Sequence, residues 1–497
     1  MNPSFATCLL VAGIAGLFYL DRDCSARPSK SLWLPVLWLA TNGSRPVSVW
    51  FGIAPKDIPG QLPSSSSLDQ LIASTLMGLG TIVLFRRPRD VRALLKGSWP
   101  IVLYFSFALI SLVWSDFPTW GLKRWVRALG DVIMVLIVAT EAHPAAALRH
   151  LFSRVGFVLL PVSVLLIKYY SELSQNFDEY GGREFTGVTT NKNMLGVLVF
   201  VLSLGALWQA LWLLRAKAQR NRTRRLVAQC TLLAFGIYLL HTARSATSVA
   251  SFALGAGLLL ILTRPVFRVR PAAVHGFTLA LLLAASLTVL LGGKDEVVEA
   301  LGRDSTLTGR TEIWSDVIQM ARNPIGGSGF ETFWLAPRVE EFYRIYGGIS
   351  RTIEAHNGYI EVYLNLGFIG VGLVALIIGH GYHKTVTAFR GDSGVGALLV
   401  AYVVALVAYN IGEAGFRMMS LSWFFLLLSV VTASAVSRTC AAVSRNRSLS
   451  RALWPEQSIP VQKLADEQER SYTESTAREQ GESTPTHKGT SIGGLEP

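Results

Sequence analysis

Three arginines in short polar stretches between apolar segments are the side chains best suited to binding a charged substrate. Arg183 lies in a Gly- and Asn-rich turn, Arg244 lies in a tight turn, and Arg310 follows Thr308, which is placed to cap a helix. Arginine suits phosphate oxygens because its planar guanidinium group donates two parallel hydrogen bonds and keeps its charge. Each arginine alone has a structural ion pair as its alternative role. As a set, they predict a site for a phosphorylated lipid head group.

A histidine at the start of an apolar segment is the candidate for proton transfer. His356 is followed by Asn357, and Glu361 and Asn365 then fall on one side of the expected helix. Histidine titrates near neutrality and is the commonest general base. The alternative is that His356 caps backbone groups at the membrane interface. We predict that His356 is catalytic and that Asn357 and Glu361 support it.

The elements that must position these residues are membrane spans. The chain has 497 residues, of which 51% are hydrophobic and only 16% charged, whereas soluble domains are about a quarter charged. About thirteen apolar segments approach the ~20 residues needed to cross a bilayer. They are residues 4–20, 31–53, 68–85, 99–115, 119–140, 151–168, 193–214, 226–243, 246–263, 272–292, 358–379, 395–411 and 418–436. The expected fold is an all-α polytopic membrane protein with about 12–13 transmembrane helices.

Two of these segments depart from a simple span. Segment 31–53 contains Pro35 and an Asn-Gly-Ser-Arg-Pro stretch, which predicts a broken helix that faces protein or water. Segment 4–20 lacks a basic region before it and a small-residue cleavage site after it, so we expect a retained span and not a signal peptide. The four cysteines have no metal-like spacing, and no disulfide is expected.

The distribution of Lys and Arg predicts the orientation. Basic clusters follow spans at 86–96, 215–225, 264–270 and 438–451, and all four can lie in the cytoplasm together. The long loop then faces outward, into the periplasm where an outer membrane exists, and a loop of this length is usually functional. The predicted parts are N-terminal spans 1–292, an outer loop 293–357, three C-terminal spans 358–436, and a basic and then disordered cytoplasmic tail 437–497.

Several of these motifs together resemble the O-antigen ligase and polymerase superfamily of bacterial membrane glycosyltransferases. His356-Asn357 with the later Gly367-Phe-Ile-Gly370 resembles the family signature. The stretch Asn323-Pro-Ile-Gly-Gly-Ser-Gly-Phe330 and the settings of Arg244 and Arg310 are also similar, and Asn191-Lys-Asn193-Met-Leu-Gly196 resembles the start of one of its spans. The likeness covers about residues 180–435. Residues 31–48 resemble the exopolysaccharide-production branch.

The resemblance implies transfer of a glycan from an undecaprenyl-diphosphate carrier to an acceptor hydroxyl, with inversion and without a metal or other cofactor. Arg183, Arg244 and Arg310 would neutralise the diphosphate, His356 would take the proton, and Asn193 would support the site. The partners would be the lipid-linked donor, a glycan or lipid-linked acceptor, membrane lipids and polysaccharide assembly proteins, with no nucleic acid. The site would lie on the outer side of the bacterial cytoplasmic membrane.

The sequence leaves other functions open. Ligase and polymerase share the donor side of the site and differ in the acceptor. A polysaccharide exporter or a flippase for lipid-linked oligosaccharides would also carry arginines facing a cavity, although transporters tend to place their sites at mid-membrane between internal repeats. No internal repeat is evident, and the polar residues gather at one surface. A scaffold for an assembly complex is a third alternative.

Overall fold

A computed structural model describes residues 2–22, 28–53, 66–177, 182–215, 221–264, 267, 273–280, 283, 307–345 and 354–453. The side chains of 307–312, Tyr343 and 442–453 are outside this description. Most of the expected span 272–292, the beginning of the expected loop and the tail after Leu453 therefore lie outside the described residues. The chain divides into one unit over Met1–Thr439 and a second over Cys440–Pro497. The account below concerns the first unit.

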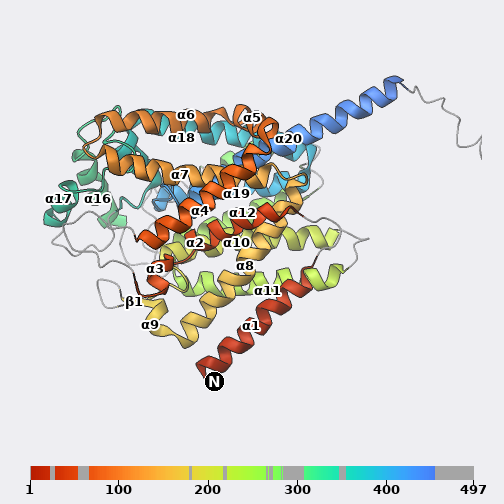
Figure 1. The fold of residues 1–497 in the computed structure, drawn as a ribbon, viewed down its shortest axis with the longest axis horizontal. Coiled ribbons are helices and arrows are strands. Elements are labelled where there is room, and N and C mark those ends of the chain that lie inside the picture. The colour runs from red at the N-terminus through yellow and green to blue at the C-terminus, as the bar shows by residue number, and fades with distance from the viewer. Residues whose placement is uncertain are drawn as a thin grey trace, which may run out of the picture. The chain divides into compact units, whose positions relative to one another are not determined.

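Helices make up almost all of the described structure (Figure 1). In chain order the longer elements are α1 (Pro3–Leu20), α2 (Trp33–Asn42), α4 (Ser67–Phe85), α5 (Pro88–Gly97), α6 (Trp99–Ile110), α7 (Pro118–Ala139), α8 (Pro144–Tyr169), α10 (Lys192–Arg215), α11 (Arg222–Ala243), α12 (Ala246–Leu262), α16 (Leu307–Gln319), α17 (Arg338–Ile345), α18 (Gly358–Gly391), α19 (Ser393–Gly412) and α20 (Leu421–Leu453). Shorter elements are η1 (Lys30–Leu32), α3 (Val47–Trp50), η2 (Ser111–Trp114), α9 (Ser171–Ser174), β1 (Gln175–Phe177) and β2 (Arg183–Phe185).

The all-α polytopic prediction is confirmed. Among the described residues, eight helices are long and apolar enough to cross a membrane, or nine if the bent pair Pro88–Gly97 and Trp99–Trp114 forms one span. This number is smaller than the expected 12–13, and the difference has physical reasons. Helix α12 falls short of 18 residues, α7 carries four charged side chains, and α2 and α3 are separate short helices. Each of these helices nevertheless coincides with an apolar segment marked in the sequence.

The core of the unit lies around α10 and α19. In each of them 78% of the most apolar window is buried, whereas the corresponding fraction is 11% in α1 and 17% in α4. The aromatic side chains of Phe152, Tyr402 and Phe425 pack together in this core at ring-centroid distances of 5.4–5.9 Å. Helices α1 and α4 therefore lie at the periphery, where apolar side chains such as Phe5 and Leu71 are exposed.

The break expected in segment 31–53 is present. Helix α2 ends at Asn42, and the chain turns through Arg45 before α3 begins at Val47. The Arg45 backbone N–H donates to Val188 O at 2.8 Å, and its guanidinium Nη2 donates to Thr186 Oγ1 at 2.8 Å. The freed backbone is thus satisfied by protein, as a broken helix at membrane depth requires.

A short antiparallel β-hairpin precedes α10 and was not predicted from the sequence. Strand β1 pairs with β2 in the register Gln175–Phe185, Asn176–Glu184 and Phe177–Arg183. The Asn176 side chain also donates to Thr190 O at 2.9 Å. The hairpin therefore fixes the polar stretch that leads into α10.

Candidate active site

His356 is held in place by the residue that follows it. The Asn357 side chain accepts hydrogen bonds from the backbone N–H groups of Tyr359 and Ile360, which caps the start of α18. Its Nδ2 donates to Ile411 O at 3.1 Å, so the cap also joins α18 to the end of α19. His356 itself has a left-handed backbone with φ +48°. Asn357 therefore fixes the start of α18 directly after the histidine, and its supporting role in catalysis stays a prediction.

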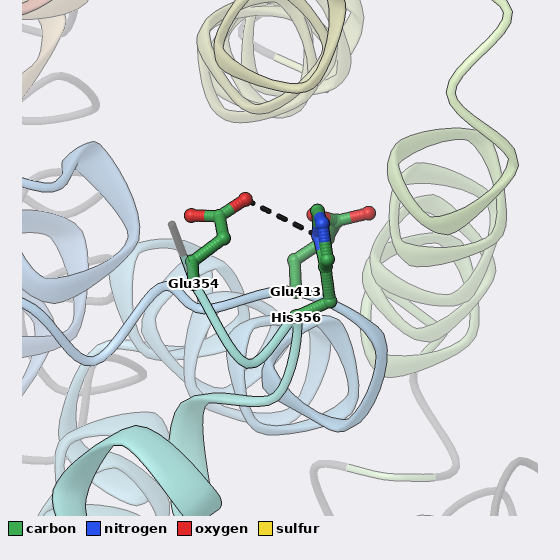
Figure 2. A group of neighbouring side chains, drawn as sticks. All are labelled: Glu354, His356 and Glu413. Atoms are coloured by element: carbon green, nitrogen blue, oxygen red, sulfur yellow. Dashed lines mark ion pairs between the residues drawn. The ribbon is translucent and has the colours of Figure 1, made fainter. Parts of the chain in front are cut away.

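Two carboxylates flank the imidazole of His356 (Figure 2). Its Nδ1 lies 3.2 Å from Glu354 Oε1 and 3.6 Å from Glu413 Oε2. Glu413 caps the C-terminal end of α19 and is buried, and Asn193 Nδ2 donates to its Oε2 at 3.0 Å. A carboxylate at Nδ1 favours the tautomer with its proton there and leaves Nε2 to accept a proton, as in hydrolase triads.

Arg417 connects the loop before α18 with the loop before α20. Its Nη1 lies 3.5 Å from Glu354 Oε2 and its Nε lies 3.9 Å from Glu331 Oε2. Burial alone would lower the pKa of Arg417, but the charges of Glu361, Glu331 and Glu354 outweigh burial and raise it. Arg417 therefore stays charged and holds Glu354 beside His356.

Glu361, the other predicted supporting residue, is hydrogen-bonded to the backbone N–H of Ala355, the residue before the histidine. Its carboxylate is buried and accepts from Trp334 Nε1 at 2.9 Å and from the Ala355 backbone N–H at 2.7 Å. Trp334 and Phe342 belong to an apolar cluster that packs the loop against α18. Glu361 thus fixes the backbone directly before His356 and joins it to the folded part of the loop.

Helix α18 is broken at Gly367, whose φ is +63° and ψ −165°. The stretch Asn323–Phe330 inserts at this break and satisfies the freed backbone groups. The hydrogen bonds are Ser328 N to Leu364 O (3.1 Å), Gly329 N to Asn365 O (2.9 Å), Phe368 N to Pro324 O (2.9 Å) and Ile369 N to Ile325 O (3.2 Å). A Cβ at Gly327 would lie 2.3 Å from Asn365 C, and one at Gly367 would lie 2.2 Å from Ile325 O. Close backbone contact explains the glycines in both motifs.

A cavity of about 600 Å³ opens beside these groups. The carboxylates Glu354 and Glu413 line this cavity, as does Asn193 at the start of α10. Two arginines also line it, Arg127 of α7 and Arg417. The volume is within the usual range for small-molecule sites. The cavity wall therefore carries the two carboxylates that flank His356, together with amide and guanidinium side chains that can bind polar groups of a substrate.

Of the three arginines predicted from the sequence, the structure describes the side chains of two. Arg183 is exposed on β2, and Arg244 is exposed at the C-cap of α11 with φ +49°. The turn after Arg244 packs on Gly196, one turn beyond Asn193 in α10, where a Cβ would lie 2.3 Å from Ser248 Oγ. Arg310 lies in the first turn of α16, and its side chain is outside the described residues. None of the three is among the described residues that line the cavity.

The sequence reasoning missed Glu354, Glu413, Arg417 and Arg127. A signal existed for Glu413 and Arg417, because both are charged residues in a short segment between two spans that was predicted to face outward. Arg127 also had a signal, since an arginine within an apolar segment is functional by default. Glu354 had no signal of its own among the ten acidic residues of 293–355.

Glu354, His356 and Glu413 together have the donor set of a metal site. The ligand atoms of Glu354, His356 and Glu413 all lie within 4.8 Å of one another. Carboxylate oxygens and an imidazole nitrogen suit divalent ions such as Mn²⁺ or Zn²⁺. The sequence prediction of a metal-independent enzyme therefore stays a prediction.

The helices and the site together define a multi-pass α-helical membrane protein with a polar site where the ends of α10, α18 and α19 meet. Residues 230–375 match the family model described as O-Antigen ligase. The chain is also 30% identical over 303 residues to Exopolysaccharide production protein ExoQ of Rhizobium meliloti (strain 1021). That alignment covers 59% of this chain and 64% of the relative, so the chain spans less than two thirds of the relative's length.

The resemblance to the O-antigen ligase family and to its exopolysaccharide-production branch is confirmed by these matches. The matched region contains Arg244, Arg310, His356 and Gly367. Asn193 and Glu413 lie outside it, on either side.

Proposed function

We propose that this protein is a membrane glycosyltransferase of cell-surface polysaccharide synthesis. It would transfer or polymerise a glycan from an undecaprenyl-diphosphate-linked donor onto an acceptor hydroxyl, on the outer side of the bacterial cytoplasmic membrane. The observation that carries the proposal is the position of His356 Nδ1 between Glu354 and Glu413, two carboxylates that line the cavity. The match of residues 230–375 to the O-antigen ligase family supports the reaction class.

The proposed reaction is a direct displacement. His356 Nε2 takes the proton of the acceptor hydroxyl, and the carboxylates of Glu354 and Glu413 lie 3.2 and 3.6 Å from its Nδ1. The acceptor oxygen forms a bond to the anomeric carbon, and the bond from that carbon to the diphosphate oxygen breaks. The electron pair leaves with undecaprenyl diphosphate, and the anomeric configuration inverts. Glu354 and Glu413 stabilise the imidazolium that forms, which is the role of the orienting carboxylate in a catalytic triad.

Charge on the leaving diphosphate needs cationic partners, because its stabilisation is usually the largest catalytic contribution. Arg183, Arg244 and Arg310 are proposed to contact the diphosphate, as the sequence predicts. The exposure of Arg183 and Arg244 suits residues that meet a lipid-linked substrate as it arrives.

The transporter alternative is separated from the enzyme by one reconstitution. Purified protein in liposomes receives an undecaprenyl-diphosphate glycan donor and an acceptor glycan, and free undecaprenyl diphosphate is measured. An enzyme releases it in proportion to product, and the His356→Ala protein does not. Movement of intact donor across the bilayer without release of undecaprenyl diphosphate would establish the transporter instead.

A further inference from the structure

Arg127 is a charged side chain of α7 that lines the cavity. It makes no hydrogen bond or ion pair with another residue in the part of the chain that the structure describes, and its Nε is buried without a hydrogen-bond partner. A buried charged donor left unsatisfied is costly, and an arginine within a membrane helix is expensive. The free protein therefore carries a destabilising feature at this position.

The nearest carboxylate on the same helix is already engaged. Asp131, one turn after Arg127, accepts from Trp38 Nε1 at 2.8 Å through Oδ1 and from the Met419 backbone N–H at 3.3 Å through Oδ2. Its charge attracts Arg127 only at longer range. Asp131 thus fastens α2 and the loop before α20 to α7, and the guanidinium of Arg127 keeps its donors available.

The other charged groups on the cavity wall have partners. Asp69 accepts from the backbone and hydroxyl of Ser48. Glu413 accepts from Asn193, and Glu354 pairs with Arg417. Among the described residues that line the cavity, Arg127 is therefore the cation available to an incoming anion.

We propose that Arg127 binds the diphosphate of the lipid-linked donor inside the cavity. This inference rests on the proposed function, because that function supplies the diphosphate ligand. Arginine forms paired, charge-assisted hydrogen bonds with phosphate oxygens, and these would satisfy the donors that the free protein leaves unpaired. Glu354 and Glu413, the carboxylates beside His356, line the same cavity as Arg127, so a diphosphate on Arg127 would share this cavity with the groups that orient the base.

The test compares Arg127→Met with Arg154→Met. Arg154 of α8 is the matched control, since it is also half-buried with a buried nitrogen (Nη1) that lacks a hydrogen-bond partner, but it stacks on Trp33 at 4.4 Å and is not on the cavity wall. Each detergent-purified protein is titrated with undecaprenyl diphosphate, with undecaprenol and with inorganic pyrophosphate. Binding and thermal stability are measured together.

We expect Arg127→Met to weaken undecaprenyl diphosphate binding by about tenfold to hundredfold, the range for charge-assisted hydrogen bonds. Undecaprenol binding should not change, and Arg154→Met should bind both lipids as the wild type does. Without ligand, Arg127→Met should be at least as thermally stable as the wild type, because an unpaired charge has been removed. A merely structural arginine would instead lower stability. Arg127→Gln, which keeps a polar side chain, serves as the second variant and should lose the same affinity.

Two outcomes separate the inference from the proposed function. Wild-type affinity for undecaprenyl diphosphate in both Arg127 variants overturns the role of Arg127 while the proposed function stands. A wild-type protein that binds undecaprenyl diphosphate no better than undecaprenol overturns the function itself. Inorganic pyrophosphate reports whether the head group alone is recognised, and tight binding of it that Arg127→Met abolishes supports the inference.

Discussion

Asn193 Nδ2 lies 3.0 Å from Glu413 Oε2, and this hydrogen bond joins the first turn of α10 to the C-cap of α19 beside His356. It links a residue that the sequence singled out to one that it missed. The order Asn193, Glu413, His356 suggests that the amide holds the carboxylate and the carboxylate orients the imidazole.

The first prediction concerns this relay. Glu413→Gln keeps a hydrogen-bonding side chain but removes the negative charge beside His356, so turnover should fall while donor binding is retained. The loss should be smaller than the ~10²–10⁴-fold expected for removal of a general base, because Glu354 still contacts Nδ1. Asn193→Ala should lower turnover less than Glu413→Gln does. Single-turnover rates measured alongside donor affinity check this order, and wild-type rates for Glu413→Gln would remove the carboxylate from the mechanism.

The second prediction separates the base from the phosphate side of the site. His356→Ala should reduce turnover by ~10²–10⁴-fold with donor binding near that of the wild type. Arg310→Lys keeps one charge but loses the planar fork, so both donor binding and turnover should suffer. His356→Asn is the control for a simple capping role, because asparagine makes the same neutral hydrogen bonds. Normal turnover by His356→Asn would end the general-base assignment.

The third prediction concerns metal. If arginines neutralise the diphosphate, transfer should proceed unchanged in EDTA. The measurement is product formation by purified protein after chelation, with Mg²⁺, Mn²⁺ or Zn²⁺ added back. Activity that EDTA abolishes and a divalent ion restores would instead favour a metal held by Glu354, His356 and Glu413, and Glu413→Gln should then weaken binding of that ion.

The fourth prediction tests the break in α18. Gly367→Ala should destabilise the protein by at least ~1–3 kcal/mol, because its φ and ψ are accessible almost only to glycine. The added Cβ would also lie 2.2 Å from Ile325 O. Gly372→Ala is the matched control on the same helix, since no atom lies within 4 Å of its Cβ position. Thermal unfolding in detergent compares the two, and equal melting temperatures would contradict the account of the break.

The fifth prediction concerns orientation. Single cysteines at Glu340 and at Ser471, introduced after the native cysteines are replaced, should label from opposite sides of the membrane. Glu340 is exposed and should react with an impermeant maleimide in whole cells or spheroplasts. Ser471 should react only after permeabilisation. Labelling of both from one side would reverse the assignment made from the basic clusters.

The helices could be predicted from the sequence because a span needs a long apolar run, and that signal is local. The signal for the start of α18 was equally local, since Asn357 directly before an apolar segment indicates a helix cap. The break between Asn42 and Val47 followed from Pro, Gly and Asn at membrane depth. These features depend on neighbours in the chain and needed no knowledge of packing.

The site was only partly predictable for the opposite reason. His356 meets Glu413 across two helices, and Arg127 reaches the cavity from a third, so their proximity depends on how the helices pack. The pairing of β1 with β2 also escaped prediction, because two three-residue strands give almost no alternating pattern. The positions of Arg183 and Arg244 were predicted as outward turns, but their distance from the cavity depends on the same helix packing.

The break in α18 has a consequence for how the active site tolerates change. The first segment of α18 runs from Gly358 to the break at Gly367. Backbone groups of Pro324–Gly329 bind its C-terminal end, and Asn357 caps its start. The position of His356 is thus fixed at both ends of the segment, and Glu361, which accepts from Trp334 and from the Ala355 backbone N–H, holds it in between. We expect substitutions elsewhere on the cavity wall to change which acceptor fits while the base stays in register.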